Sequence, residues 1–187
     1  MSVGKALTQA LAAGDPAAFA ALYDRLVPRL YATAHTLTGS AAEAEDIVQE
    51  LFVDLATNRH RLNEVSDLEA YLFTSLRHIV SRRWRRRDVH RRALEKLAIE
   101  HRDDSPNAHS SPVPDEELAR AIEHLPEAQR EVLALKIDGG LTFAEIARVT
   151  GTSLNTAASR YRYALSRLRQ LLTAAQPTSR PSRTITS

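Results

Sequence analysis

The chain has 187 residues, 43% of them hydrophobic, and its charge is nearly balanced, with 25 Lys and Arg against 23 Asp and Glu. These values are typical of a soluble globular protein. The sequence contains no cysteine, which excludes disulfides, thiolate metal sites and cysteine nucleophiles. Aromatic residues make up 5% and glycines number six, so helix is favoured over strand. We expect an all-α protein made of two small helical domains joined by a flexible linker.

Charge is segregated along the chain. Residues 77–92 read RHIVSRRWRRRDVHRR, in which eight of sixteen residues are arginine and only Asp88 is acidic. Because the overall charge is nearly balanced, acidic segments elsewhere must offset this arginine block, and such segregation indicates more than one partner. The N-terminus lacks a basic start followed by an apolar segment, and no apolar run is long enough to span a membrane. We therefore expect a cytoplasmic protein without membrane insertion.

The first domain is expected over residues 15–100, after an N-terminal extension, residues 1–14, that gives no clear signal. Asp15 followed by Pro16 predicts a helix start, and Pro28 predicts a kink or a break into two helices. The apolar residues at helical spacing in this segment are Phe19, Leu22, Tyr23, Leu26, Leu30, Ala34 and Leu37.

A second helix is predicted over residues 41–57. Ser40 and Glu43 form a capping-box pattern, and apolar residues follow on one helical face. Beside that face lies an acidic ridge, which consists of Glu43, Asp46, Glu50 and Asp54. A solvated face is the simpler interpretation, but like charges at this spacing are mildly destabilising, and only Arg59 and Arg61 beyond the helix would offset them. A basic or polar partner for the ridge is the alternative.

A third helix begins near Leu68 and runs into the arginine block. Its apolar positions would pack on the two preceding helices, and Phe73, Arg77 and Trp84 would lie together at the rim of its polar side. Flat side chains beside cations form a surface on which unpaired bases stack, with about 1–3 kcal/mol per base. We interpret this aromatic strip, defined as Phe73, Arg77 and Trp84, as a surface for single-stranded nucleic acid, although Phe73 alone would be assigned to the edge of the core.

A linker and a second domain follow. Residues 101–117 are rich in proline, serine and acidic residues and lack helical periodicity, as in an extended chain. The domain over residues 118–173 contains a short capped helix, a turn at Gly151 and a longer helix capped by Ser153, which is the helix-turn-helix arrangement. The tail, residues 174–187, is polar and is expected to be disordered.

The last helix has a polar face typical of major-groove docking. Between residues 153 and 172 there are four arginines and no acidic residue. Short polar side chains at the start of the helix suit contacts to base edges, and the cations behind them suit contacts to phosphates. The residues expected to face outward are Asn155, Thr156, Ser159, Arg160, Tyr163 and Arg167. The residues expected to face the core are Leu154, Ala158, Tyr161, Leu165, Leu168 and Leu172.

Both halves of the chain resemble one family, the bacterial RNA polymerase sigma factors of the two-domain extracytoplasmic-function (ECF) type. The stretches that carry the resemblance are AEAEDIVQELF, which ends at Phe52, YLFTSLRHIVSRRWRRR over residues 71–87, and LPEAQREVLALKIDGGLTFAEIARVTGTSLNTAASRYRYALSRLRQLL over residues 125–172. Three motifs in this order are more specific than a lone helix-turn-helix. The resemblance implies a transcription initiation factor that binds core polymerase, directs it to specific promoters and assists strand opening, with no catalysis and no cofactor of its own.

The resemblance also implies a role for each group of residues. The residues that would contact the polymerase clamp are Asp46, Gln49, Glu50 and Phe52. The residues that would bind the melted minus-ten strand are Phe73, Arg77, His78, Arg82, Arg83, Trp84 and Arg86. The residues that would read the minus-thirty-five element as duplex are Ser153, Asn155, Thr156, Ser159, Arg160 and Arg162. The expected partners are the clamp and flap of the large polymerase subunits and promoter DNA, single-stranded and duplex, with an anti-sigma factor as a candidate further partner.

Several positions depart from the family pattern. Tyr71 stands in place of a tryptophan, His78 in place of an asparagine, and Arg82 in place of an aspartate. The last two lie in the strand-reading region, so the family's base preferences do not transfer to this chain. Ala158 removes a cation from the last helix, and Tyr163 stands where a basic residue is frequent. We expect weaker or differently placed duplex contacts without loss of function.

Two other functions fit parts of the sequence. A stand-alone helix-turn-helix regulator explains residues 141–172 but leaves the aromatic strip and the acidic ridge without a role. A nucleic-acid enzyme would need a metal site or a phosphate-binding loop, but the seven histidines follow no metal-binding spacing and no glycine-rich phosphate loop occurs. We therefore expect no catalytic residue and no bound metal.

Overall fold

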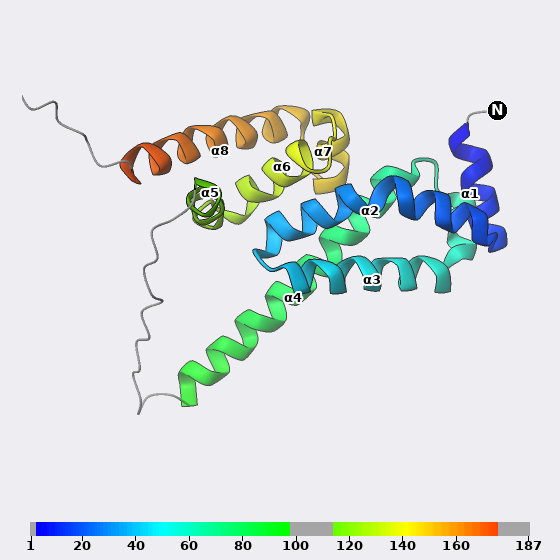
Figure 1. The fold of residues 1–187 in the computed structure, drawn as a ribbon, viewed down its shortest axis with the longest axis horizontal. Coiled ribbons are helices and arrows are strands. Elements are labelled where there is room, and N and C mark those ends of the chain that lie inside the picture. The colour runs from blue at the N-terminus through cyan, green and yellow to red at the C-terminus, as the bar shows by residue number, and fades with distance from the viewer. Residues whose placement is uncertain (1–2, 98–113, 176–187) are drawn as a thin grey trace, which may run out of the picture.

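The computed structural model describes residues 3–97 and 114–175, and every regular element in these ranges is a helix (Figure 1). The elements are α1 (Val3–Ala13), α2 (Pro16–Thr38), α3 (Ala41–Thr57), the 3-10 helix η1 (Arg59–Glu64), α4 (Leu68–Leu97), α5 (Pro114–Glu123), α6 (Glu127–Ile137), α7 (Phe143–Thr150) and α8 (Leu154–Ala175). The all-α prediction is confirmed. Most of the predicted linker and tail falls outside the described residues.

The first domain is built from α1 to α4 around an apolar core. Asp15 caps α2 by accepting the Ala17 N–H at 2.9 Å, and α3 begins at Ala41 as predicted, capped by Ser40. Buried leucines and isoleucines line the facing sides of the long helices, and they include Leu22, Leu26, Leu30, Ile47, Leu51, Leu55, Leu72 and Leu76. Although Pro28 lacks an N–H donor, α2 continues through it as one helix, because the buried leucines before and after it pack on the same core.

The helix α1 was not predicted from the sequence. It packs against η1 and α2, and its Leu11 is fully buried. The segment expected to be an N-terminal extension therefore contributes to the packing of the first domain. Its residues are small and mildly apolar, and its contact with η1, whose Leu62 is also buried, stabilises this short helix.

The second domain consists of α5 to α8, and α5 begins at Pro114, inside the range predicted as linker. Glu145 completes the expected capping box of α7, because its carboxylate accepts the Thr142 N–H at 2.7 Å while the Thr142 hydroxyl accepts the Glu145 N–H. Gly151 has a φ of 65°, which glycine adopts without steric penalty, and it turns the chain into α8. The short helix, glycine turn and long helix thus have the predicted arrangement.

The two domains pack against each other. α6 contacts α2 and α7 contacts α4, so that one apolar cluster joins Leu72 and Phe73 of the first domain to Leu135 and Leu141 of the second (Figure 1). Gly139 permits this close approach, since a Cβ at that position would lie 3.1 Å from Phe73 Cε1. Removing one phenylalanine side chain from water contributes about 1.5–3 kcal/mol, so apolar burial is a main source of the attraction between the domains.

Candidate nucleic-acid and partner interfaces

The aromatic strip lies beneath the second domain. Phe73 is 0% exposed, Arg77 Nε donates to Glu131 Oε1 at 2.5 Å, and the guanidinium of Arg130 lies 5.2 Å from the centroid of the Trp84 ring. Phe73 is thus part of the core, as expected for this residue taken alone, whereas Arg77 and Trp84, which were expected to face solvent, are half-buried because residues of α6 partly cover them. The role of the strip in binding DNA stays a prediction.

The opposite side of α4 is open. Tyr71, Ser75, His78 and Arg82 line a cavity of about 180 Å³ between α4, the end of α3 and the start of η1. The other residues around this cavity are Leu51, Asp54, Leu55, Asn58, Arg61 and Ile79. An aromatic ring together with cationic, acidic and amide groups suits a flat polar heterocycle such as a nucleobase. Two of the predicted minus-ten residues, His78 and Arg82, thus lie apart from the aromatic strip.

The acidic ridge and the arginine block pair with each other. The ion pairs that join α3 to α4 are Arg82–Glu50, Arg83–Glu50, Arg83–Asp46 and Arg87–Glu43. The expectation that only Arg59 and Arg61 could offset the ridge is wrong, since α4 lies alongside α3 and supplies the cations. Glu50 forms ion pairs with two arginines, and the distance between its Oε2 and Arg83 Nη2 is 2.9 Å. Arg86, also a predicted minus-ten residue, is exposed.

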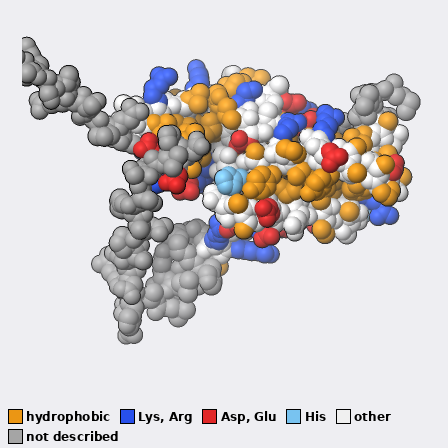
Figure 2. Space-filling model, viewed as in Figure 1, with side chains coloured by type: hydrophobic (Ala, Val, Ile, Leu, Met, Phe, Trp, Pro, Cys, Tyr) orange, Lys and Arg blue, Asp and Glu red, His pale blue; other side chains and the backbone are white. Residues whose placement is uncertain are grey.

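The predicted polymerase contacts lie on a face of the first domain that is partly apolar. Asp46 and Gln49 are exposed, and the half-buried Phe52 ring lies 5.2 Å from the ring of Tyr23. Tyr23 was expected to face the core but is 51% exposed, and the neighbouring Val53 is 64% exposed. Figure 2 shows hydrophobic side chains gathered over α2 and α3. No local signal distinguished Tyr23 from the buried residues of the same helical stripe.

Half of the predicted duplex-reading side chains on α8 and at its cap are exposed to solvent. Ser153, Asn155 and Arg162 are exposed, and Thr156, Ser159 and Arg160 are half-buried. Ser153 Oγ accepts the Thr156 N–H at 3.1 Å, which caps the helix and fixes its first turn. Figure 2 shows basic side chains projecting from the region of α8, whose only basic residues are arginines.

The inward stripe of α8 differs from the predicted one. Its buried residues are Ala157, Ala164 and Leu168, whereas Leu154 and Leu165 are 52% and 44% exposed. The prediction assigned Leu154 and Leu165 to the core, but two small alanines allow α8 to pack closely on α6 and α7. The exposed leucines consequently lie on the side of the helix that carries the polar residues.

Two carboxyl groups have shifted pKa values. Burial raises the pKa of Asp138, which lies at the end of α6, against a smaller lowering by the Thr36 side chain and by His35 of α2. Hydrogen bonds from the side chain and backbone of Thr142 lower the pKa of Glu145. The first group belongs to the contact between the domains, and the second belongs to the local cap of α7.

The described part of the chain, residues 3–97 and 114–175, contains no group of three or more acidic, histidine or cysteine side chains placed to hold a metal ion. In the same ranges no helix is long and apolar enough to cross a membrane. The site is therefore a set of polar and aromatic surfaces.

Comparison with known proteins decides the family. The family model Sigma-70 region 2 matches residues 22–89, and Sigma-70, region 4 matches residues 115–168. The ECF RNA polymerase sigma factor EcfG of Rhodopseudomonas palustris is 33% identical over 148 residues, which cover 78% of this chain and 80% of that protein. The chain belongs to the ECF sigma factors. As an ECF sigma factor it is a transcription initiation factor that binds RNA polymerase and directs it to promoters, as the sequence motifs predicted.

Other ECF sigma factors support the same assignment. RpoE of Cereibacter sphaeroides is 29% identical over 163 residues, which cover 83% of this chain and 87% of that protein. Among solved structures, RpoE of Bartonella quintana in complex with the anti-sigma factor NepR has a TM-score of 0.67 at 24% identity and covers 84% of this chain and 98% of that one. CnrH in complex with the cytosolic domain of CnrY also has a TM-score of 0.67, at 23% identity, and covers 92% of this chain and 98% of that one. The two structures share the fold of this chain.

Proposed function

We propose that three surfaces of this sigma factor have different binding functions. The first domain, α1 to α4, binds the polymerase clamp through α3 and captures the melted minus-ten strand through α4. The second domain, α5 to α8, reads the minus-thirty-five duplex through α8. The polymerase performs all the chemistry, so the sigma factor contributes no catalytic residue and acts in the cytoplasm.

The cavity between α3 and α4 is the observation that supports strand capture best. Its volume of about 180 Å³ suits one unstacked base, and Tyr71, His78 and Arg82 supply an aromatic face and hydrogen-bonding groups. Unstacking a base costs a few kcal/mol, which stacking and hydrogen bonds in such a cavity offset. Because His78 is exposed while neighbouring Ile79 is buried, its side chain is available to a strand that passes along α4.

The exposed first turn of α8 supports duplex reading. Asn155 carries an amide that can donate and accept hydrogen bonds at a base edge, and Arg162 on the same helix can contact phosphate. The half-buried Arg160 lies between them in the sequence and completes a polar face. The described part of α8 carries no acidic residue that would repel DNA.

The partly apolar face of α3 supports binding to a protein partner. Phe52, Tyr23 and Val53 combine exposed apolar area with the exposed carboxylate of Asp46, as many protein interfaces do. We assign this face to the polymerase clamp and expect α8 and its neighbours to reach the flap. An anti-sigma factor is a further candidate partner, because one solved structure of similar fold is a complex with the anti-sigma factor NepR and another is a complex with the cytosolic domain of CnrY.

Transcription in vitro tests the proposal directly. Core polymerase and fragmented genomic DNA of the host would be incubated with and without the chain, and run-off transcripts that depend on the chain are expected. On a promoter found this way, His78→Ala should lower open-complex formation while leaving core binding intact, and Asp46→Arg should lower core binding.

The matched control for the strand-binding variant is His124→Ala, which removes the same type of side chain from the turn that follows α5 in the second domain. If the chain adds no transcripts to those of core polymerase alone, the proposal is refuted. Equal effects of His78→Ala and His124→Ala would refute the assignment of the cavity while leaving the initiation function in place.

A further inference from the structure

The second domain occupies the aromatic strip with groups that imitate a bound DNA strand. The Glu131 carboxylate accepts a hydrogen bond from Arg77 Nε at 2.5 Å, in the way that a phosphate oxygen would. The Arg130 guanidinium lies over the Trp84 ring, 5.2 Å from its centroid, on a face where a base would stack. A strand and the second domain therefore cannot use this surface at the same time.

Several contacts between the two domains involve Phe73 and its neighbours. The Phe73 ring is 0% exposed, the Arg29 guanidinium lies 5.5 Å from its centroid, and Arg29 Nε donates to the Gly139 carbonyl at 3.0 Å. The Glu131 side chain is only 13% exposed and its Arg77 partner 30% exposed, so water weakens their attraction less than at an open surface. These contacts join α2 and α4 of the first domain to α6 of the second.

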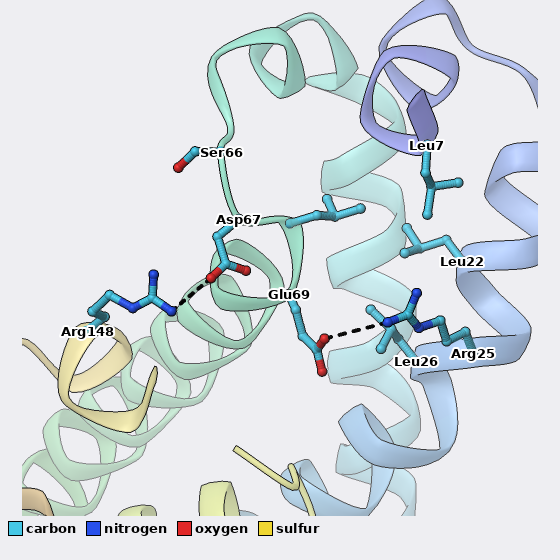
Figure 3. Close-up of a pocket in the computed structure, with 9 residues that line it drawn as sticks. Leu7, Leu22, Arg25, Leu26, Ser66, Asp67, Glu69 and Arg148 are labelled. Atoms are coloured by element: carbon cyan, nitrogen blue, oxygen red, sulfur yellow. Dashed lines mark ion pairs between the residues drawn. The ribbon is translucent and has the colours of Figure 1, made fainter. Parts of the chain in front are cut away.

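The other end of the contact is looser. Figure 3 shows Arg148 of α7 pointing toward Asp67, and their ion pair measures 2.9 Å between Nη2 and Oδ2. Beside it lies a cavity of about 390 Å³ lined by Leu7, Leu22, Leu26 and charged side chains. Because the Arg148 side chain is 59% exposed and the cavity leaves neighbouring surfaces unpacked, little holds the domains together here. Separation of the domains would therefore be opposed mainly by the apolar cluster around Phe73, which it would expose to water.

Two functional faces remain accessible in this arrangement. Ser153, Asn155 and Arg162 at the front of α8 are exposed, and Asp46 and Gln49 on α3 are exposed. The closed chain therefore still presents its proposed duplex and polymerase faces while the aromatic strip is covered.

We propose that Glu131 and Arg130 form an intramolecular competitor that keeps single-stranded DNA off the aromatic strip of the free sigma factor until the domains separate. The inference rests on the proposed role of the aromatic strip. The apparent affinity for a strand then equals the intrinsic affinity multiplied by the fraction of molecules that are open. Removing the Glu131 carboxylate, which pairs with Arg77, raises the fraction of open molecules.

The test uses the full chain, in which Glu131→Gln removes the carboxylate charge but keeps the side-chain shape. The control is Glu127→Gln, an exposed glutamate in the first turn of the same helix. Since the chain has no cysteine, Asp24→Cys in the first domain and Gln170→Cys in the second give two unique sites for fluorescent labels, which report the distance between the domains. Binding is measured with short single-stranded oligonucleotides of randomised sequence and, separately, with duplexes of the same sequences.

We expect Glu131→Gln to lengthen the distance between the labels and to raise affinity for the single strands about tenfold, with duplex affinity unchanged and Glu127→Gln like the wild type. In the double variant Arg77→Glu with Glu131→Arg, the reversed pair should restore the short distance, which separates loss of the pair from misfolding. An unchanged distance in Glu131→Gln would overturn the proposal, and so would a lengthened distance without any gain in strand binding.

Failure of the competitor and failure of the proposed strand-binding role can be told apart in holoenzyme. Trp84→Ala is assayed there for open-complex formation. If Trp84→Ala impairs opening but Glu131→Gln changes neither distance nor binding, only the competitor is refuted. If Trp84→Ala leaves opening intact, the aromatic strip has no part in strand capture and both proposals about it are refuted.

Discussion

The two sides of α4 both carry arginines neutralised by carboxylates, but the carboxylates come from different places. Arg82 and Arg83 pair with Glu50 of the adjacent α3, inside the same domain. Arg77 pairs with Glu131, which is 54 residues away in the other domain. The first pairing persists whatever the domains do, whereas the second ends when they separate.

This difference indicates which cations are available to a partner. The arginines next to α3 are held in fixed positions and are partly neutralised at all times, so they serve mainly to shape the cavity and its surroundings. Arg77 changes from a neutralised to a free cation when the second domain leaves. The domain arrangement thereby controls the charge that one side of α4 presents.

The largest difference in unfolding free energy is expected between substitutions of the aromatic residues on the two sides of α4. Phe73→Ala removes a ring that the second domain buries fully, and we expect the free energy of unfolding to fall by about 3 kcal/mol. Tyr71→Ala, on the half-buried cavity side, should cost about half as much or less. Urea denaturation measures both, and equal losses would mean that Phe73 is not covered in solution.

The tryptophan of the covered side provides the next test. Trp84→Ala should impair open-complex formation about tenfold while changing core binding little, because stacking on one base contributes about 1–3 kcal/mol. Permanganate footprinting of the promoter and co-purification with core polymerase measure the two steps. Equal losses in both assays would remove Trp84 from strand capture.

The ion pairs between α3 and α4 should contribute less to the free energy of unfolding and should not affect the domain arrangement. Glu50→Gln leaves two arginines without their carboxylate, and we expect a loss of about 1 kcal/mol in unfolding free energy, since the pair is partly exposed. The exposed Glu45→Gln on the same helix is the control. The distance between labelled domains should stay as in the wild type, and a lengthened distance would show that α3 also governs closure.

The smallest effect is expected at a carboxylate that belongs to neither side of α4. Glu145→Gln should destabilise the cap of α7 by about 0.5 kcal/mol at pH 7. The pKa of Glu145 is lowered from its ordinary value of 4.5 in the folded state, so its contribution is present above that value and is lost as pH falls through the folded pKa. The difference in stability between wild type and variant should therefore shrink in acid, which urea titrations at two pH values would reveal. A difference that grows in acid would contradict this assignment.

Local features of this chain were predictable because their causes are local. The helix over 41–57, its Ser40 cap, the capping box at Thr142 and the glycine turn before α8 follow from residues a few positions apart. The ordered motifs likewise indicate the ECF sigma factor family from the sequence alone.

The errors arose where a distant segment decides the environment of a residue. Helical spacing placed Phe73 at a rim, but it could not show that α6 covers this rim. The same limit applies to the acidic ridge on α3, because its arginine partners lie on α4, which follows only after η1. Tyr23 and Leu154 were assigned to the core by residue type, although each lies at the margin of a buried stripe and is more than half exposed.

Arg29 makes the contact between the domains depend on the shape of a side chain as well as on its charge. Its Nε and Nη2 both donate to the Gly139 carbonyl, its Nη1 pairs with Glu69, and its plane lies near Phe73. A lysine at this position would keep the positive charge but could not provide the planar fork of donors. We therefore expect Arg29→Lys, a conservative replacement of one cation by another, to weaken the contact between the domains.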